Sequence, residues 1–485
     1  MQTPCRGEHC STAVRRTPGP YVDAADTTGT HCVPLHWNRQ KPQITINHGH
    51  PTHIVYVIRT FSCGGLYIVS ILRITGGRQL EGAIRIHGAK NSVLPIMAAS
   101  ILARGETIIH NCPKLADVNA AIKILRHLGC TVDRSGSSVV INSAQMTRSD
   151  IPHELMKEMR SSVIFLGAIL ARCGEAALSM PGGCELGPRP VDLHIMALHE
   201  MGAQITDEGG SIICKANELL SCKINFSIPS VGATENAMLA ATACRGTTTI
   251  TNAAREPEIG DLQRYLRSIG VKVTGAGTST IIVEGGKIKA NAEHHVIPDR
   301  IVAATYLACA AASLGRIELT NVIPGHIATV TDAFSEMGCR LKISDDAIYI
   351  DAAGKLRAIK PVITRPYPGF PTDAQPPLMA ASLKASGTTV FIESIFENRY
   401  RHIGELLRMG ADIKTEGKVA MVTGVSRLFG APVESTDLRG GAALCVAALG
   451  AEGVTEVSGL HHIDRGYDGF TESLAAIGAD IVRVE

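Results

Sequence analysis

Lys90 stands where a cation could bind an anion. It lies in the tetrapeptide Gly88-Ala-Lys-Asn91, after an expected strand over residues 83–87 and just before an apolar helix. A helix N-terminus stabilises anions such as phosphate, and a lysine beside it adds a positive charge. A solvated lysine in an ordinary turn would have the same local sequence. The tetrapeptide therefore leaves a phosphate site and a surface lysine as alternatives.

Cys184 lies among turn-forming residues. Residues 181–188 contain three Gly and two Pro around it, Arg189 follows directly, and His194 comes shortly after. Such a segment favours a flexible, exposed loop, and a nearby guanidinium group favours the thiolate form of a cysteine. We therefore expect Cys184 to be a reactive thiol rather than a buried structural one.

Asp373 follows the dipeptide Pro371-Thr372 and a proline-rich stretch that starts at Pro366. This composition predicts a rigid, non-helical segment from which a carboxylate could act as a general base. Three further segments place an arginine close to a carboxylate: Phe396-Glu-Asn-Arg399, Asp437-Leu-Arg439 and Asp464-Arg-Gly-Tyr467. Each of these could be a local ion pair, and together they could form a cradle for an anion.

A repeat of about 70 residues organises the chain that positions these groups. An apolar residue, a glycine and a small residue precede an alternating strand six times, starting at Leu128, Met201, Ile269, Met337, Met409 and Ile477. The glycine is expected to end a helix in the left-handed conformation. An Ala-rich helix, a turn and a β-branched strand also recur six times, at residues 99–111, 167–180, 240–252, 308–321, 380–393 and 442–457. The pattern predicts six α/β units.

The small residues of the repeated helices predict that these helices are packed inside and the sheets lie outside. Six such units exceed what one hydrophobic core normally supports. We therefore expect two domains of three units each, with a ligand-binding cleft between them.

The composition excludes several classes of protein. A net charge of +2 gives no general attraction to polyanions, and aromatic residues are only 4%, with one Trp, which argues against a nucleic-acid binder. The longest charge-free apolar runs, such as residues 301–314, are too short to span a membrane. The 14 cysteines form no C-x-x-C pair, so we expect no metal site, reduced thiols and a cytoplasmic protein without a secretory signal.

Residues 1–68 differ from the rest because they are rich in His and Pro and show no sustained amphipathic pattern. They are expected to form an N-terminal extension of unknown role, and their composition is compatible with disorder. A tail, a targeting segment and an upstream stretch included by a mis-assigned start remain open. A short β-like run covers residues 53–60.

The motifs together resemble the UDP-N-acetylglucosamine 1-carboxyvinyltransferase family of enolpyruvyl transferases, over about residues 69–485. The resemblance is carried, in order, by Gly88-Ala-Lys-Asn91, Pro181-Gly-Gly-Cys184, Arg189-Pro-Val-Asp-Leu193, Ala254-Arg-Glu-Pro-Glu258, Pro371-Thr-Asp373, Phe396-Glu-Asn-Arg399 and His462-Ile-Asp-Arg-Gly-Tyr467. It implies an α/β fold of two inside-out α/β barrel domains, each of three repeated units, with the active site in the interdomain cleft. Residues 69–89 plus 298–485 would form one domain, and residues 90–297 the domain that carries the Cys loop.

The resemblance also implies an activity. The enolpyruvyl group of phosphoenolpyruvate would be transferred to the 3'-hydroxyl of UDP-N-acetylglucosamine with release of phosphate, the first committed step of peptidoglycan synthesis. Neither a metal nor another cofactor would be required. Cys184, Asp373, Lys90 and Arg465 would be catalytic: Cys184 as the proton donor, Asp373 as the base for the sugar hydroxyl, and Lys90 and Arg465, with Arg189, as the cation cradle. Asn91 would hold the reacting hydroxyl.

The substrate-binding residues that the resemblance implies extend this set. They are Lys90, Asn91, Arg160, Arg189, Pro190, Val191, Asp192, Leu193, Ser230, Val231, Gly232, Asp373, Ile395, Arg399, Arg439 and Arg465. The partners would be two small-molecule substrates, without nucleic acid or membrane, and the oligomeric state stays open. Two alternatives are a sister enzyme acting on shikimate 3-phosphate, which would have no use for the Cys loop or a uridine pocket, and a non-enzymatic repeat scaffold.

Overall fold

The computed structural model describes residues 70–179 and 191–485, which belong to a single compact unit of the chain. Six four-stranded sheets and their helices make up this part. Each unit starts with an inner helix that is buried along most of its length. The inner helices are α1 (Lys90–Ser100), α4 (Phe165–Cys173), α6 (Val231–Ala241), α8 (Arg300–Ser313), α10 (Gln375–Ser382) and α12 (Leu438–Leu449).

A strand follows each inner helix, and an outer, amphipathic helix follows each strand. The strands are β3 (Glu106–His110), β7 (Glu175–Ser179), β11 (Thr247–Thr251), β15 (Arg316–Thr320), β19 (Thr388–Ile392) and β23 (Val454–Ser458). The outer helices are α2 (Ala116–His127), α5 (Asp192–Glu200), α7 (Pro257–Ser268), α9 (Ala328–Met337), α11 (Ile403–Arg408) and α13 (Phe470–Ala476). The predicted order of elements in six α/β units is therefore confirmed.

A hairpin closes five of the units. The hairpins are β4 (Thr131–Ser135) with β5 (Ser138–Asn142), β8 (Gln204–Glu208) with β9 (Ser211–Lys215), β12 (Lys272–Thr274) with β13 (Thr280–Glu284), β16 (Arg340–Ile343) with β17 (Ala347–Asp351), and β20 (Asp412–Glu416) with β21 (Val419–Thr423). Each sheet adds one parallel edge strand: β14 (Ala292–His295), β6 (Asp150–Ile151), β10 (Lys223–Asn225), β2 (Glu81–Arg85), β18 (Val362–Ile363) and β22 (Pro432–Glu434). The remaining helical elements are α3 (His153–Glu158), η1 (Ile101–Ala103), η2 (Arg160–Ile164), η3 (Pro324–Ile327), η4 (Thr372–Ala374) and η5 (Ile463–Arg465).

The glycine before each alternating strand ends the outer helix as predicted. Gly129, Gly202, Gly270, Gly338, Gly410 and Gly478 all have φ between 85° and 105°. Glycine adopts this conformation at no steric cost because it has no Cβ. The local turn chemistry of the repeat is therefore the same in all six units.

The two N-terminal strands complete the sheets of two units that come later in the chain. Gly76 and Gly77 separate β1 (Ile71–Thr75) from β2 (Glu81–Arg85). A Cβ on Gly76 would lie 2.2 Å from the Ala448 carbonyl oxygen, so the chain can pass α12 only with glycine there. β1 then pairs antiparallel with β23 and β24 (Asp480–Val484), and β2 pairs parallel with β15.

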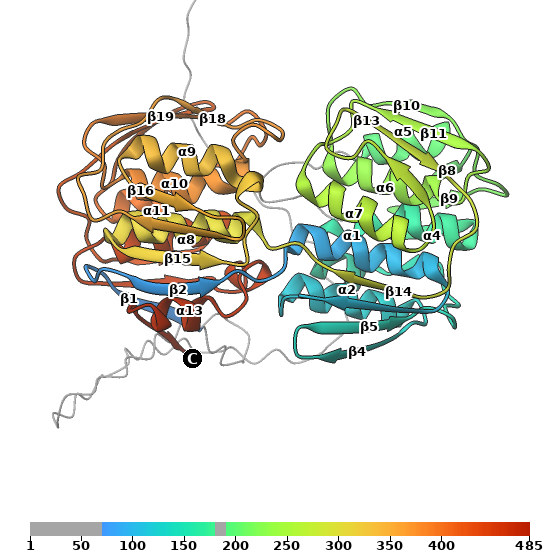
Figure 1. Cartoon of the computed structure of the whole chain (residues 1–485), viewed down its shortest axis with the longest axis horizontal. Coiled ribbons are helices and arrows are strands. Elements are labelled where there is room, and N and C mark those ends of the chain that lie inside the picture. Colours follow the sequence, from blue (N-terminus) through green and yellow to red (C-terminus); the bar gives the residue numbers. More distant parts are fainter. Residues whose placement is uncertain (1–69, 180–190) are drawn as a thin grey trace, which may run out of the picture. The chain divides into compact units, whose positions relative to one another are not determined.

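Two separate clusters of buried apolar side chains form the cores. One contains residues between 72 and 86 and between 302 and 481, and the other contains residues between 93 and 296. In the first, α8, α10 and α12 pack against one another through alanines, as the small-residue pattern predicted. Figure 1 shows the inner helices of each cluster with sheets around them. No helix within residues 70–179 and 191–485 has the length and apolar character needed to cross a bilayer.

Candidate active site

Lys90 is the first residue of α1, as the sequence predicted, but it is not solvated. Its side chain is 11% exposed, and its Nζ donates to Asp117 Oδ2 at 3.1 Å. Its backbone N–H donates to Asp299 Oδ2 at 3.0 Å. Gly88 is needed just before it, because a Cβ there would lie 1.7 Å from the Asn111 carbonyl oxygen. The alternative of an ordinary surface lysine is therefore wrong.

Asp117, in the first turn of α2, joins Lys90 to Arg465. Arg465 lies in η5 and donates from Nε to Asp117 Oδ1 at 2.8 Å and from Nη2 to Oδ2 at 3.3 Å. Burial raises the pKa of Asp117, but Lys90 and Arg465 together lower it by more. The pKa of Asp117 is therefore below its usual value. The sequence analysis did not identify Asp117, because an acidic residue in the first turn of a helix is an ordinary helix-stabilising feature.

Asp373 lies in η4, directly before α10, and its carboxylate is bound by two arginines. Arg399 Nη2 donates to Oδ1, and Arg439 Nη2 donates to Oδ2 at 3.2 Å. The expected non-helical segment is thus a short 3₁₀ turn that leads into a helix. Burial alone would raise the pKa of Asp373, but Arg439, Arg399 and Lys90 hold this pKa well below its usual range. Asp373 is therefore an ionised carboxylate at neutral pH.

The three arginines near carboxylates in the sequence do not form those local pairs. Arg399 and Arg439 both bind Asp373, while Asp437 caps α12 by accepting from the backbone N–H groups of Arg439 and Gly440. Arg465 binds Asp117, and its neighbour Asp464 binds Arg483 at 2.9 Å. The interpretation as local ion pairs is therefore wrong, because partners come from distant segments.

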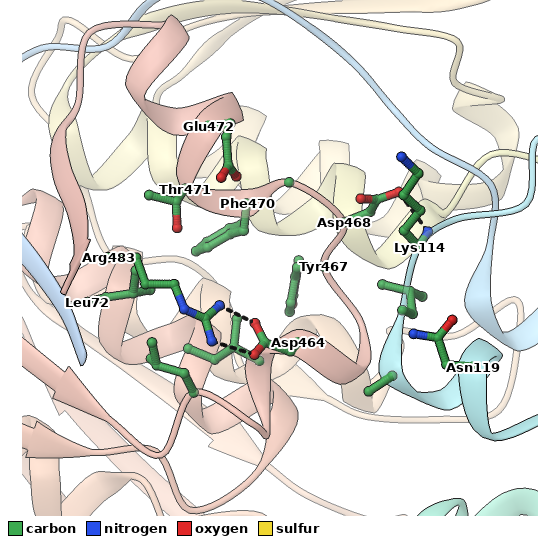
Figure 2. A pocket seen from close by; sticks show the side chains of 15 residues that line it. Leu72, Lys114, Asn119, Asp464, Tyr467, Asp468, Phe470, Thr471, Glu472 and Arg483 are labelled. Atoms are coloured by element: carbon green, nitrogen blue, oxygen red, sulfur yellow. Dashed lines mark hydrogen bonds and ion pairs between the residues drawn. The ribbon is translucent and has the colours of Figure 1, made fainter. Parts of the chain in front are cut away.

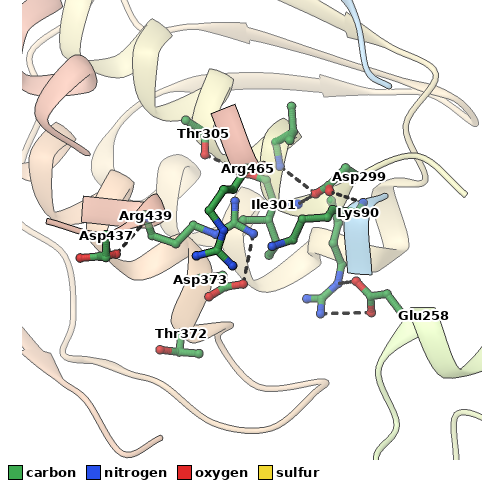
Figure 3. Close-up of polar contacts among 12 residues, drawn as sticks. Lys90, Glu258, Asp299, Ile301, Thr305, Thr372, Asp373, Asp437, Arg439 and Arg465 are labelled. Carbon is green, nitrogen blue, oxygen red and sulfur yellow. Dashed lines mark hydrogen bonds and ion pairs between the residues drawn. The ribbon is translucent and has the colours of Figure 1, made fainter. Parts of the chain in front are cut away.

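These charges lie close enough to act on one another. Figure 3 shows the ends of Lys90, Arg439 and Arg465 near Asp373. The pKa of Lys90 is lowered mainly by burial and further by Arg439 and Arg465, while Asp117 opposes the change. Crowded cations repel one another in a buried site, and a bound anion would relieve that repulsion. The arrangement can therefore hold a phosphate or carboxylate next to an ionised base.

Asp299 supports this arrangement and was also missed by the sequence analysis. One of its oxygens accepts from Ile301 N and Val302 N at the start of α8, and the other accepts from Lys90 N at the start of α1. A signal was present, because an Asp directly before a long apolar run is an N-cap pattern. The second contact, to Lys90, has no counterpart in the local sequence.

Six other predicted binding residues lie at the starts of α5 and α6. Ser230 caps α6 by accepting from Ala233 N at 3.4 Å, and Val231 and Gly232 form its first turn. Val191 is the N-cap residue of α5, and Asp192 and Leu193 lie in its first turn.

His194 joins the starts of α5 and α6. A Cβ on Gly232 would lie 3.0 Å from the His194 ring, and His194 Nδ1 lies 2.6 Å from Asn236 Nδ2. Asn236 Oδ1 accepts from Gly167 N, so its amide group donates to Nδ1, and the His194 proton is on Nε2.

Some predicted residues cannot be placed. Cys184, Arg189 and Pro190 lie outside the described residues. The backbone of Arg160 begins η2, and its side chain is likewise not described. Asn91 follows Lys90 in α1 and is half-buried, and Ile395 is 39% exposed. Their roles remain predictions.

A hollow of about 470 Å³ lies beside η5 and is lined by residues such as Lys114, Asn119, Asp464, Tyr467 and Arg483 (Figure 2). Its lining contains neither Lys90, Asp373 nor Arg465, and Asp464 and Arg483 neutralise each other. We therefore place the candidate reaction at the charged cluster of Figure 3 instead. Within the described residues, no group of three His, Cys, Asp or Glu side chains is arranged to hold a metal ion.

Comparison with known proteins defines the class. The family model "EPSP synthase (3-phosphoshikimate 1-carboxyvinyltransferase)" matches residues 74–474. The solved enolpyruvyl transferase NikO from Streptomyces tendae is similar, with a TM-score of 0.77 and 26% identity over 86% of this chain and 99% of that chain. EPSP synthase from Acinetobacter baumannii shares the fold at a TM-score of 0.66, with 20% identity over 86% of this chain and 100% of that chain. The chain belongs to the EPSP synthase family of carboxyvinyl transferases.

Curated relatives narrow the class further. UDP-N-acetylglucosamine 1-carboxyvinyltransferase 2 of Caldanaerobacter subterraneus subsp. tengcongensis is 48% identical over 85% of this chain and 99% of its own length. UDP-N-acetylglucosamine 1-carboxyvinyltransferase of Geotalea uraniireducens is 44% identical over 85% of this chain and 99% of its own length. The predicted membership of the UDP-N-acetylglucosamine 1-carboxyvinyltransferase family is therefore confirmed.

Proposed function

We propose that the protein transfers the enolpyruvyl group of phosphoenolpyruvate to the 3'-hydroxyl of UDP-N-acetylglucosamine and releases phosphate, the first committed step of peptidoglycan synthesis. The observation that carries the proposal is the meeting of Lys90, Arg439 and Arg465 beside the ionised carboxylate of Asp373. A substrate with both a phosphate and a carboxylate group needs such cations, and an attacking hydroxyl needs such a base. The curated relatives supply the identity of the acceptor.

Lys90 and Arg465, with Arg189, bind the phosphate and carboxylate of phosphoenolpyruvate. In the described structure Asp117 holds Lys90 and Arg465 together, so these two cations are preorganised before substrate binds. Preorganised donors stabilise charge as it develops in the transition state without further rearrangement. Asn91, next to Lys90, holds the reacting hydroxyl.

Asp373 accepts the proton of the 3'-hydroxyl. Two arginines keep this carboxylate ionised, which makes it always available but a weak base. The hydroxyl proton becomes strongly acidic only as the oxygen bonds to C2 of the enolpyruvate. Proton transfer to Asp373 is therefore coupled to formation of the C–O bond.

The carbon chemistry is addition followed by elimination. Cys184 gives a proton to C3 while the sugar oxygen bonds to C2, which forms a tetrahedral ketal. C3 then loses a proton as the C2–O bond to phosphate breaks, so the enol is restored on the sugar and phosphate leaves. No oxidation or reduction takes place, and no metal or cofactor enters the balance.

The nucleotide sugar is bound by Arg160, by residues 189–193, by residues 230–232 and by Ile395. The start of α6 supports this assignment, because helix N-termini bind phosphate groups and Gly232 leaves its backbone approachable. Residues 69–89 plus 298–485 form one domain and residues 90–297 the other, and the two separate apolar cores support this division. We place the enzyme in the cytoplasm, in keeping with nine free thiols among the described cysteines.

Phosphate release measured with both substrates tests the proposal directly. Release is expected only when phosphoenolpyruvate and UDP-N-acetylglucosamine are present together. Thermal-shift measurements with each acceptor distinguish this reaction from the transfer to shikimate 3-phosphate. A ligand at about 100 times its Kd stabilises the folded protein by about 2.7 kcal/mol. Stabilisation by shikimate 3-phosphate alone would contradict the proposal, and absence of phosphate release with either acceptor would favour a non-enzymatic scaffold.

A further inference from the structure

The residue that follows the central strand is an asparagine in three of the six units, whereas Met180 follows β7, Glu393 follows β19 and Gly459 follows β23. Asn111, Asn252 and Asn321 follow β3, β11 and β15, and each has a positive φ of 53–55°. Each side-chain amide donates to the first carbonyl beyond the parallel edge strand, namely that of Val296, Phe226 or Ile86. This asparagine therefore ties the ends of two neighbouring strands together, which is a structural role.

Glu393 takes this place after β19 and makes none of those contacts. Ser394 ties the strand ends together instead, because its backbone N–H donates to Thr364 Oγ1 at 2.9 Å and its hydroxyl donates to the Thr364 carbonyl. Thr364 is the first residue beyond the edge strand β18. The side chain of Glu393 thus does not have the structural role that the asparagine has in three other units.

Glu393 is 1% exposed, and its two oxygens bind different segments. Oε2 accepts from the Thr372 hydroxyl at 2.9 Å. Oε1 accepts from the backbone N–H groups of Ile395 and Phe396 at 2.8 and 3.0 Å. A buried carboxylate is costly unless hydrogen bonds satisfy it, and these three donors do so.

Both segments that Glu393 binds also contact the guanidinium group of Arg399. Arg399 Nε donates to the carbonyl and to the hydroxyl oxygen of Thr372, each at 3.2 Å. The Phe396 ring lies 5.3 Å from the Arg399 guanidinium carbon. Arg399 is itself 1% exposed and donates to Asp373. Glu393 therefore holds the two groups between which Arg399 is oriented toward the candidate base.

We propose that Glu393 is a positioning residue for the enolpyruvyl transfer, acting through the Thr372 hydroxyl and Arg399 to orient the carboxylate of Asp373, and holding Ile395 at the nucleotide side with its other oxygen. The proposal rests on the proposed function of the site. Under this proposal one buried carboxylate has two positioning roles. One oxygen positions the base through Thr372, and the other holds the segment that is expected to contact the nucleotide sugar.

Two substitutions break the same hydrogen bond from opposite ends. Thr372→Val removes the hydroxyl with little change of shape. Glu393→Gln keeps an acceptor for Ile395 and Phe396 but replaces the acceptor of Thr372 by an amide donor. We expect each to lower kcat by about tenfold, because a small misplacement of a reacting group is costly, while KM for UDP-N-acetylglucosamine changes less than about twofold. Thr372→Ser, which restores the hydroxyl, is expected to recover kcat to within about twofold of the wild-type value.

The double variant Thr372→Val/Glu393→Gln measures whether the two residues act as one. If they do, its kcat is expected to match that of the single variants, because the link is already broken. The matched controls are Thr388→Val and Glu416→Gln, two exposed positions on the same sheet, which are expected to leave kcat unchanged. Multiplied losses in the double variant, or no recovery with Thr372→Ser, would overturn the proposal.

Crystal structures of the Thr372→Val and Thr372→Ser variants provide a readout that does not depend on activity. The Arg399 guanidinium is expected to leave its position against Asp373 in the first and to keep it in the second. A wild-type enzyme that releases no phosphate would overturn the proposed function, and an unchanged Arg399 in Thr372→Val would separately overturn the positioning role.

Discussion

The six inner helices occupy the same position in their α/β units but differ in the charge at their N-termini. Three of them belong to the core cluster that includes residues 302–481, and each starts at a carboxylate: Asp299 caps α8, Asp437 caps α12, and Asp373 lies in the turn that leads into α10. The helices of the other cluster start differently, with Lys90 as the first residue of α1, Arg160 as the first residue of η2 before α4, and Ser230 as the cap of α6.

The carboxylates at the helix N-termini stabilise the fold, whereas Lys90 at the start of α1 does not. An acidic residue at a helix N-terminus stabilises the helix by about 0.3–1 kcal/mol, and a cation there destabilises it by a similar amount. Lys90 therefore lies where the helix dipole disfavours it, and Asp117 and Asp299 offset this cost. A residue kept in an unfavourable place by two buried carboxylates is better explained by an anionic ligand than by the fold.

The largest expected effect tests the cation side of this comparison. Lys90→Ala and Arg465→Ala are each expected to lower kcat/KM for phosphoenolpyruvate by about 10²–10³-fold, because each removes a preorganised cation. Arg160→Ala is expected to act mainly on KM for UDP-N-acetylglucosamine. Steady-state kinetics with each substrate varied in turn measures both. Lys123→Ala, an exposed lysine paired with Glu158, is the control. Equal losses for both substrates in all three variants would contradict the assignment.

A second test compares the thiols. We expect an alkylating reagent to modify Cys184 at least about ten times faster than any described cysteine, with loss of turnover, because Arg189 favours its thiolate. Burial raises the pKa of Cys112, Cys130, Cys214 and Cys244 to about 11, so few of these thiols are ionised at neutral pH.

The relevant competitor is Cys173, which is exposed, although burial of its thiol still raises its pKa. Peptide mass mapping after brief labelling identifies the first adduct, and a Cys173→Ser variant serves as the control. First labelling at another cysteine, with activity retained by the Cys184 adduct, would show that Cys184 is not the reactive thiol.

Two buried histidines, one in each of the two core regions, lead us to expect that stability depends on pH. Burial lowers the pKa of His194 and of His402 to about 4 in the folded state. The unfolded chain binds these protons near pH 6.5, so stability is lost as the pH falls from about 6.5 toward 4. Each histidine is expected to reduce the free energy of unfolding by about 2 kcal/mol between pH 7 and pH 5.

Urea unfolding at both pH values measures this effect. His194→Gln, which still accepts from Asn236, is expected to reduce the pH dependence by the contribution of one histidine. His153→Gln removes an exposed histidine and is expected to leave the dependence unchanged. The same dependence in His194→Gln and the wild-type protein would show that His194 is not held neutral in the folded state.

The smallest expected effect concerns the N-terminal extension, residues 1–68. A protein that starts at Ser70 is expected to fold and to release phosphate at the full-length rate, because every repeat and every motif lies after that residue. The competing view is that the β-like run at residues 53–60 pairs with an edge strand, so that its removal exposes that edge. Aggregation or loss of activity of the shortened protein, with a sound full-length chain, would assign the extension to the fold.

The sequence by itself determined the features that depend on neighbouring residues. The six units, the glycine that ends each outer helix and the position of Lys90 at a helix start all follow from periodicity and turn chemistry within about 15 residues. The inner packing of the Ala-rich helices was predictable for the same reason, since small side chains permit close helix contact.

Only the tertiary structure decided which charges meet. Asp117 binds Lys90 across 27 residues and Arg465 across 348, and Asp373 takes Arg399 and Arg439 rather than leaving each to the carboxylate beside it in the sequence. β1 likewise completes the sheet of the last unit instead of continuing into β2. Ionic partners depend on which helix ends the packing of the cores brings together, and spacing along the chain carries no information on that distance.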